Sequence, residues 1–360
     1  MGLDHLLPLV ALFFASAVPH AGSASLVAVV PDSAAAELKA KVTTPWQFVS
    51  AASASADELE KAVVVVPDFG MIRSASTMSA VLQRIPAGTL LQLPMTGTDT
   101  LDLASIPSRF SVCNVHNAGT AIPEYVLAAV MSWNVQLPKL SADFRSCAWH
   151  AGNKSVCQRP PMHKETKGQT MGVVGYGTIG QGVVQRAAAM GMRVVAIDSS
   201  PHSSTPPPLA WIGNDTMLPR LMEEADFVVI SVPLLPATRG MINADILSHM
   251  KSSGVLVNIA RGPIVDEFAL YSVLKEGKIG GAVIDVWWQE MDPDAWPSRF
   301  DFSAMPNVWM TLHTSFNTLE AHEEGTRQIA ANLDLFATGK PLQHIVRGPS
   351  GLSSGDSISI

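Results

Sequence analysis

The feature that most constrains this chain is an apolar run leading into a glycine-rich turn, Val173-Val174-Gly175-Tyr176-Gly177-Thr178-Ile179-Gly180. The pattern is that of a buried strand followed by G-x-G-x-x-G, and a helix-compatible segment comes next. A second apolar strand over residues 193–197 ends in Asp198, eighteen residues after Gly180. Strand, glycines, helix, strand and acid in this order predict a dinucleotide-binding unit.

Each residue of this pattern has a physical role in the prediction. Gly175 allows a tight turn, Gly177 lets the backbone approach a pyrophosphate, and Gly180 lets the helix pack close to the strand. The N-terminus of the helix offers N–H groups and a positive dipole end to the phosphates. Asp198 accepts hydrogen bonds from the adenosine ribose, which favours NAD over NADP because a 2′-phosphate would meet a like charge.

Composition narrows the class of protein. A chain of 360 residues, with 47% hydrophobic and 15% charged residues, has room for two domains with large cores. The net charge of −7, without a run of Lys or Arg, argues against a nucleic-acid-binding face. Cys113, Cys147 and Cys157 lack C-x-x-C spacing, which excludes a zinc framework, and we expect no metal. Their odd number leaves at least one free thiol unless two chains pair.

The N-terminus carries an apolar run over residues 6–18, too short to span a membrane, followed by small residues up to Ala24. This pattern resembles a secretory signal peptide over residues 1–24. Against it, Asp4 precedes the run and the first basic residue of the Lys or Arg type is Lys39. The alternative is an N-terminal extension outside the fold, and only the signal would direct the protein to the secretory pathway.

From Leu26 onward, short apolar strands alternate with helical stretches. This alternation predicts an α/β protein with parallel, doubly wound sheets. A helix is expected from Pro123, a connection over 146–167, and a disordered tail over 348–360. The predicted strands besides those already named are 26–30, 62–66, 90–93, 111–114, 227–232, 255–259, 282–286 and 308–312.

Three polar groups follow predicted strands of the second half of the chain. Arg261 follows one strand, Asp285 lies near the end of the next with Glu290 five residues on, and His313 closes a third. Taken singly, they could be a surface ion pair, a solvated loop acid and a core histidine. Because ligands bind outside the carboxyl ends of parallel strands, the group is better explained by one shared pocket.

Three segments carry a resemblance to a known family, the D-isomer-specific 2-hydroxyacid dehydrogenases. Residues 258–267, Asn-Ile-Ala-Arg-Gly-Pro-Ile-Val-Asp-Glu, look like one family signature. Residues 226–234 with Thr238 resemble a second signature, and residues 281–286 a third. The resemblance covers about residues 26–347 in motif order. It implies a Rossmann NAD-binding domain over 126–316, inserted in a flavodoxin-like substrate domain made of 25–125 and the returning segment 317–347.

The resemblance also implies an activity, hydride transfer between NAD(H) and a small 2-keto or D-2-hydroxy acid. His313 is implied as the acid–base residue, oriented by Glu290, and Arg261 as the residue that binds the substrate carboxylate. Asp285 is expected beside the nicotinamide. Backbone amides of the loop Met95-Thr96-Gly97 are expected to hold the same carboxylate.

Further cofactor contacts implied by the resemblance are Thr178, Ile179, Val232, Pro233, Thr238, Ile259, Ala260, Arg261, His313 and Ser315. Family members are usually dimers through the nucleotide domain, so a homodimer is expected by analogy, as is a cytoplasmic location. The substrate loop has no basic cluster for a phosphorylated acid. A small acid such as glyoxylate, hydroxypyruvate or pyruvate is therefore the expected substrate.

Departures from the family pattern keep alternatives open. Leu312 stands where the family usually has Pro, and Phe316 lies among usually small residues. A slip of one residue would put Gln289 in the place of Glu290, as in formate dehydrogenases; the spacing from Asp285 favours Glu290. The other readings are an NAD(H)-binding sensor similar to the corepressors of this fold, and a catalytically impaired paralogue.

Overall fold

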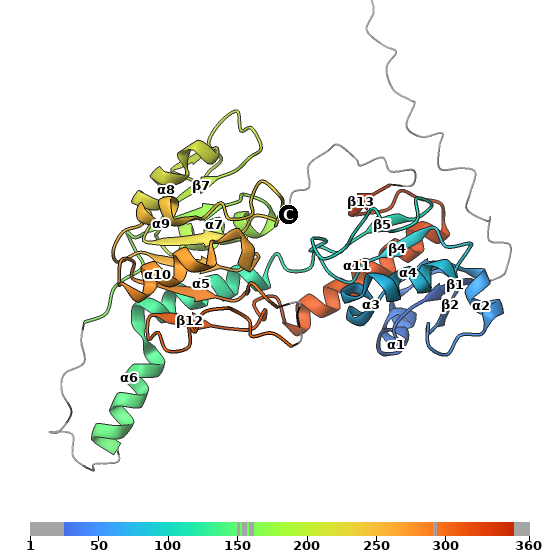
Figure 1. Cartoon of the computed structure of the whole chain (residues 1–360), viewed down its shortest axis with the longest axis horizontal. Helices are drawn as coiled ribbons and strands as arrows, with labels where there is room; N and C mark the ends of the chain where they lie inside the picture. The colour runs from blue at the N-terminus through green and yellow to red at the C-terminus, as the bar shows by residue number, and fades with distance from the viewer. Residues whose placement is uncertain are drawn as a thin grey trace, which may run out of the picture. The chain divides into compact units, whose positions relative to one another are not determined.

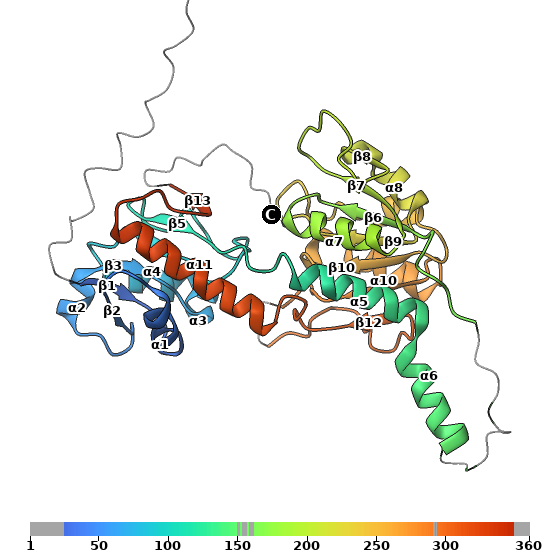
Figure 2. The ribbon, with the colours of Figure 1, turned by 180° about the vertical axis from the view of Figure 1, so that it is seen from behind.

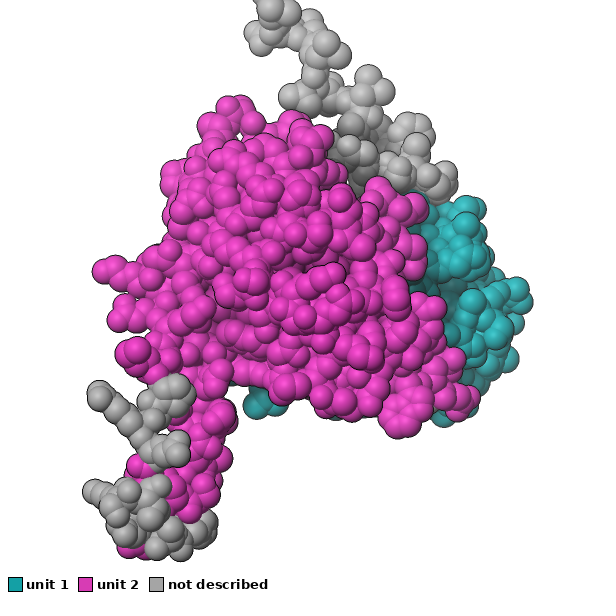
Figure 3. Space-filling model, turned by 60° about the vertical axis from the view of Figure 1, so that its left-hand side comes forward, with its two compact units in different colours: residues 1–117, 319–358 teal, residues 118–318, 359–360 magenta. Residues whose placement is uncertain are grey.

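The computed structural model describes residues 25–149, 152, 157, 162–290, 292 and 294–348. These divide into two compact units: unit 1 holds 25–117 and 319–348, and unit 2 holds 118–318 (Figure 3). Both crossings differ from the expected ones at 125–126 and 316–317. Helix α5 (Ala121–Val135) explains the first difference, because Pro123 in its first turn already packs on Gly182 of unit 2. The expected signal segment and the tail after residue 348 lie outside the described residues.

Unit 1 is built on a six-stranded sheet of order β13-β5-β4-β3-β1-β2. Strands β1 to β5 are parallel in the order 2-1-3-4-5, which is flavodoxin-like, and β13 adds an antiparallel edge beside β5. The strands are β1 (Leu26–Val29), β2 (Trp46–Val49), β3 (Ala62–Val65), β4 (Leu90–Gln92), β5 (Ser111–Cys113) and β13 (Ile345–Arg347). The short strands β2 and β13 were not predicted.

Helices cover both faces of this sheet (Figures 1 and 2). On one face Leu38 packs with Ile329 and Leu333 against the strands, and on the other Leu59 and Leu82 do so. The free thiol of Cys113 is fully buried, and burial raises its pKa to about 12. The helices of unit 1 are α1 (Asp32–Lys41), α2 (Ala56–Lys61), α3 (Phe69–Arg73), α4 (Ala75–Gln83) and α11 (Leu319–Ala337).

Unit 2 is built on a seven-stranded parallel sheet of order β12-β11-β10-β9-β6-β7-β8. Counted from β6, this is the Rossmann order 3-2-1-4-5-6 with a seventh strand, so the α/β doubly wound prediction is confirmed. The strands are β6 (Thr170–Val174), β7 (Arg193–Ile197), β8 (Trp211–Gly213), β9 (Phe227–Ile230), β10 (Val255–Asn258), β11 (Gly281–Ile284) and β12 (Val308–Met310). The three-residue strand β8 was not predicted.

Two layers of helices enclose the sheet of unit 2. Val126 of α5 and Val183 of α7 pack on one face, and Leu221 of α8 and Leu270 of α10 pack on the other. Fully buried parallel strands read as continuous apolar runs, which is why β6 and β9 were readable from sequence. The remaining helical elements are α7 (Thr178–Ala189), α8 (Leu218–Glu224), α9 (Ala244–Ser248), α10 (Glu267–Lys275) and the short 3₁₀ turns Asp215–Met217 and Gly262–Ile264.

Helix α6 (Leu137–Phe144) projects from the body of unit 2 and continues into a π-helical turn, Arg145–Trp149 (Figures 1 and 2). No residue of α6 is buried, although Leu137 and Phe144 are apolar. A disulfide joins Cys147 at the tip to Cys157, inside the predicted connection. Among the described helices of the whole chain, none has the length and apolarity that a membrane crossing requires.

Candidate active site

The glycine-rich turn between β6 and α7 is shaped by contacts that exclude side chains. Gly175 has a φ of +102°, and a Cβ there would lie 2.8 Å from the Ser231 carbonyl oxygen. A Cβ on Gly180 would lie 2.0 Å from the carbonyl oxygen of Gly175. Gly177 is the N-cap residue of α7 and cannot cap its first-turn N–H groups with a side chain. The turn therefore fits a pyrophosphate against the N-terminus of α7.

Ser231, a residue that the sequence analysis missed, supports this turn from the end of β9. Its buried hydroxyl donates to the carbonyl oxygens of Val174, at 3.2 Å, and Gly175, at 2.8 Å. Nothing in a single sequence separates this serine from others, because the contact spans more than fifty residues. The Ser231 hydroxyl thereby fixes the Gly175 carbonyl oxygen, against which Gly180 of α7 packs, and stabilises the conformation of the turn.

Asp198 directly follows β7, the neighbour of β6 in the sheet. Its amide donates to the Gly213 carbonyl oxygen at 2.9 Å, and its Oδ2 lies 2.7 Å from Nε2 of His202. The carboxylate therefore stands at the same sheet edge as the glycine-rich turn, where the adenosine ribose is expected.

Arg261 lies three residues after the end of β10, and Asn258 shapes the backbone around it. The Asn258 amide donates to the Arg261 carbonyl oxygen at 3.0 Å and accepts from the N–H of Ala260 at 3.1 Å. Gly262 comes next, and a Cβ there would lie 2.3 Å from the carbonyl carbon of Trp287. This close approach brings the loop after β10 against the loop after β11, which carries Glu290.

Glu290 and His313 meet as a pair. His313 Nδ1 lies 2.9 Å from Glu290 Oε2, and the other carboxylate oxygen accepts from the N–H of Trp287. It is thus Glu290, rather than Gln289, that contacts the imidazole. Because a carboxylate only accepts, Nδ1 carries the hydrogen and Nε2 is left to exchange a proton. His313 has a left-handed φ of +49°, an unusual conformation for a residue with a Cβ.

Asp285 holds the His313 turn in that conformation. The Asp285 carboxylate is fully buried and accepts from the N–H groups of Thr314, at 2.8 Å, and Ser315, at 3.0 Å. The Thr311 hydroxyl donates to it at 2.6 Å, so the Tyr125 hydroxyl, 2.6 Å from Thr311, must donate in turn. Burial raises the pKa of Tyr125, which keeps this donor protonated. The nicotinamide contact expected of Asp285 stays a prediction.

The two unusual residues beside His313 lie in different surroundings. The Phe316 ring meets the imidazole edge-on, with ring centroids 5.7 Å apart, and packs against the core of unit 2. Leu312 is 66% exposed. Phe316 therefore limits the orientation of the imidazole, whereas the Leu312 side chain lies largely in solvent.

The predicted substrate loop belongs to unit 1, where it follows β4. Thr96 Oγ1 donates to the Val115 carbonyl oxygen at 2.7 Å, and Asn114 Nδ2 donates to the Thr96 carbonyl oxygen at 2.6 Å. Within the described residues, the N–H groups of Thr96 and Gly97 have no hydrogen-bond partner. Side chains thus fix a loop whose amides can bind an anion.

The remaining predicted cofactor residues follow β9 and β10. Thr238 Oγ1 donates to the Pro233 carbonyl oxygen at 2.6 Å and accepts from the N–H of Leu235 at 2.8 Å, which closes the loop after β9. Ile259 is buried against the α5 side of the sheet. Among the described residues, no three His, Cys, Asp or Glu side chains form a metal site.

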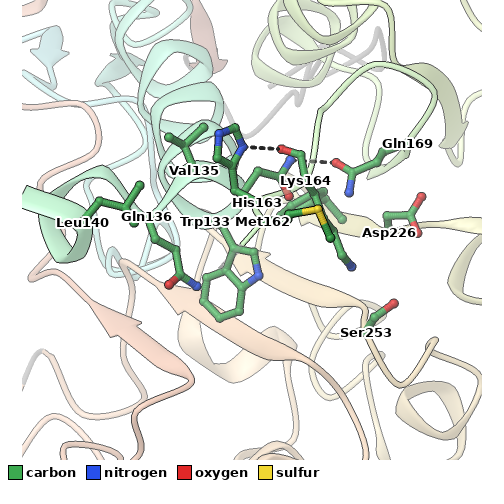
Figure 4. Close-up of a pocket in the computed structure, with 12 residues that line it drawn as sticks. Trp133, Val135, Gln136, Leu140, Met162, His163, Lys164, Gln169, Asp226 and Ser253 are labelled. Atoms are coloured by element: carbon green, nitrogen blue, oxygen red, sulfur yellow. Dashed lines mark hydrogen bonds between the residues drawn. The ribbon is translucent and has the colours of Figure 1, made fainter. Parts of the chain in front are cut away.

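A cavity of about 280 Å³ lies at the opposite edge of the unit 2 sheet, and Figure 4 shows its lining residues. Gln169, Asp226 and Ser253 come from the segments before β6, β9 and β10, and Trp133 and Leu140 come from α5 and α6. Asp226 there serves the fold, since it accepts from the Thr170 N–H and from Lys251. This cavity is separate from the residues at the carboxyl ends of the strands.

Comparisons with known proteins agree with this arrangement. Residues 127–315 match the family described as D-isomer specific 2-hydroxyacid dehydrogenase, NAD binding domain. The chain is 31% identical to a glycerate dehydrogenase of Methylorubrum extorquens, over 78% of this chain and 85% of that one. It is 30% identical to a hydroxypyruvate reductase of Thermotoga maritima, over 74% and 83%.

A solved structure shares the fold. The D-isomer specific 2-hydroxyacid dehydrogenase of Xanthobacter autotrophicus, solved in complex with NADPH and MES, aligns with a TM-score of 0.70. The alignment covers 90% of this chain and 98% of that one at 22% sequence identity. At that identity the likeness concerns the fold alone.

Proposed function

Because this chain belongs to the D-isomer-specific 2-hydroxyacid dehydrogenases, an NAD-binding family of oxidoreductases, we propose that it interconverts a small 2-keto acid and the corresponding D-2-hydroxy acid. The observation that carries the proposal is the His313–Glu290 pair, which stands at the same sheet edge as the glycine-rich turn. That arrangement supports the assignment of an acid–base group beside a dinucleotide site.

The residues that would hold NAD(H) fit its parts. The glycine-rich turn and the N-terminus of α7 would bind the pyrophosphate, and Asp198 the adenosine ribose. When bound, NADH supplies the hydride. Asp198 also supports a preference for NAD, since its charge opposes a 2′-phosphate; the NADPH complex of the Xanthobacter protein shows that the fold does not impose this preference.

His313 would handle the proton. In reduction, its Nε2 gives a proton to the substrate oxygen as the carbonyl carbon gains hydride; in oxidation it takes that proton back. Glu290 holds Nδ1 and stabilises the charged imidazole. Asp285 fixes the turn, so a proton donor with few alternative orientations meets the substrate.

Arg261 and the 95–97 loop would bind the substrate. The planar guanidinium fork suits a carboxylate, and the amides of Thr96 and Gly97 are suited to the same negative charge. The names of the two relatives, a glycerate dehydrogenase and a hydroxypyruvate reductase, support hydroxypyruvate among the small acids expected, which also include glyoxylate and pyruvate. We also propose a homodimer, and the exposed apolar side chains of α6 and its tip, Leu137, Phe144 and Trp149, support it.

The deciding test is NADH oxidation with glyoxylate, hydroxypyruvate, pyruvate and longer 2-keto acids, repeated with NADPH. We expect turnover with at least one small acid and higher kcat/KM with NADH. If NADH binds by fluorescence but no acid is reduced, the protein is a sensor or an impaired enzyme. Phe316 is the residue to test for the latter, through Phe316→Ala, because it contacts His313.

A further inference from the structure

The carboxylate assigned to the adenosine ribose is already paired with a histidine of its own loop. His202 Nε2 lies 2.7 Å from Asp198 Oδ2, and the side chains are only 26% and 18% exposed. The pair is therefore partly shielded from solvent, where a charge on the histidine is felt more strongly than at an open surface. Asp198 Oδ1 is left for the ribose.

The same histidine also contacts the phosphate-binding turn. The Tyr176 ring, between the first two glycines of the motif, meets the His202 ring edge-on at a centroid distance of 5.9 Å. Burial raises the pKa of Tyr176, so the phenol stays neutral. Within the described residues, Asp198 is the one carboxylate paired with His202. His202 thus joins the two parts of the predicted adenosine site, and its protonation decides the local charge.

We propose that His202 is a specificity-determining residue that sets how strongly this site rejects a 2′-phosphate. The inference rests on the proposed function, in which Asp198 binds the ribose. A neutral His202 donates to Asp198 and leaves a net charge of −1, which repels a phosphate. A protonated His202 brings the net charge to zero and offers the phosphate a cation.

The direction of the pH effect follows from these two states. Protonation of the imidazole removes the net negative charge of the pair, so rejection of NADP is stronger at high pH and weaker at low pH. One unit charge at about 4 Å in water-like surroundings is worth about a fivefold change in an equilibrium constant. We therefore expect the discrimination between NAD⁺ and NADP⁺ to fall about fivefold or more between pH 8.5 and pH 5.5.

The experiment measures dissociation constants of NAD⁺ and NADP⁺ by calorimetry on the full chain at four pH values from 5.5 to 8.5. The variant His202→Gln keeps a hydrogen-bond donor for Asp198 but cannot take up a proton. His249→Gln is the matched control, because His249, which follows α9, pairs with Glu223 of α8 at 3.0 Å. The 2′-phosphate itself takes up a proton near pH 6, which changes NADP⁺ binding with pH in every variant. The effect of His202 is therefore the difference in pH dependence between wild type and His202→Gln.

The inference is supported if the ratio of the two dissociation constants changes with pH in wild type and in His249→Gln, and if this change is about fivefold smaller in His202→Gln. The inference is overturned if His202→Gln, with an unchanged melting temperature, follows the wild-type profile. Asp198→Asn tests the proposed ribose site apart from His202. Loss of the carboxylate should remove the discrimination between NAD⁺ and NADP⁺ at every pH. If Asp198→Asn discriminates like wild type, or wild type binds neither cofactor, the proposed ribose site itself is wrong.

Discussion

At the carboxyl edge of the unit 2 sheet, charged side chains bond to one another, whereas at the same edge of the unit 1 sheet side chains bond to the backbone. Glu290 orients His313 in unit 2, while in unit 1 the side chains of Thr96, after β4, and Asn114, after β5, each donate to a carbonyl oxygen of the other's loop. Strands β1 to β5 of unit 1 and all strands of unit 2 are parallel, so the contrast lies in the loops that follow them. On the proposed function, the unit 2 edge would supply reacting groups and the unit 1 edge an anion-binding backbone.

The contrast is tested most strongly by His313→Gln. Glutamine cannot exchange a proton, so we expect kcat to fall by about 10²- to 10⁴-fold. The dissociation constant of NADH should stay within about twofold, because the variant leaves the glycine-rich turn intact. Steady-state kinetics and fluorescence titration measure the two. Full activity in this variant would show that unit 2 does not supply the acid–base group.

Arg261→Lys tests whether a planar fork is needed at that edge. Lysine keeps the charge but loses one of two parallel hydrogen bonds, so kcat/KM for the keto acid should fall by about 30-fold. Arg327→Lys, in an exposed ion pair with Glu324 on α11, is the control. Equal kinetic effects of both substitutions would contradict the role given to Arg261.

Gly180→Ala tests the cofactor half of the unit 2 edge. The added Cβ would lie 2.0 Å from the Gly175 carbonyl oxygen, so the turn must shift. We expect a loss of about 1–3 kcal/mol in unfolding free energy and weaker NADH binding, by about tenfold. Thermal unfolding and titration with NADH measure these. Unchanged NADH affinity would mean that this turn is not the pyrophosphate site.

Thr96→Val tests the unit 1 edge. The variant loses the hydrogen bond to Val115, worth about 1 kcal/mol, and loosens the loop. The KM for the keto acid should rise by about fivefold while NADH affinity is unchanged, which is the reverse of Gly180→Ala. If Thr96→Val weakened NADH binding instead, the division of roles between the two edges would be wrong.

The last prediction concerns stability away from both edges. Asp334 of α11 accepts from the N–H and hydroxyl groups of Thr43 and Thr44. Burial opposes the charged form, but these hydrogen bonds prevail and lower its pKa. The stabilisation is present above the unfolded-state pKa and is lost as pH falls through the lower folded-state value. Asp334→Asn should cost about 2 kcal/mol at pH 7 and less in acid, as measured by urea unfolding.

The sequence was most informative where function is encoded in contiguous residues. The glycine-rich turn is readable because its spacing follows from local geometry, and the buried strands β6, β9 and β10 are readable as apolar runs. The doubly wound fold was predicted from this alternation and is confirmed.

What the sequence did not predict depends on contacts between distant segments. The strands β2, β8 and β13 are three or four residues long, and pairing with neighbours defines them more than their own composition. The hydrogen bonds of Asp285 reach Thr311–Ser315, about thirty residues away. His202 follows Asp198 by four residues in a loop, where no periodic pattern indicates that their side chains meet.

The insertion of unit 2 into unit 1 has a consequence for the order of folding. The two ends of the insertion are close, because Asn117 donates to the Ala321 carbonyl oxygen at 2.9 Å. During synthesis, unit 1 cannot be completed until α11 and β13 have been made, and the ribosome makes them only after all of residues 118–318. Until then the face of its core where Leu333 packs is covered only in part, by α1. A ribosome-bound chain thus completes its cofactor-binding half first, and early folding of that half shortens the loop that the other half must close.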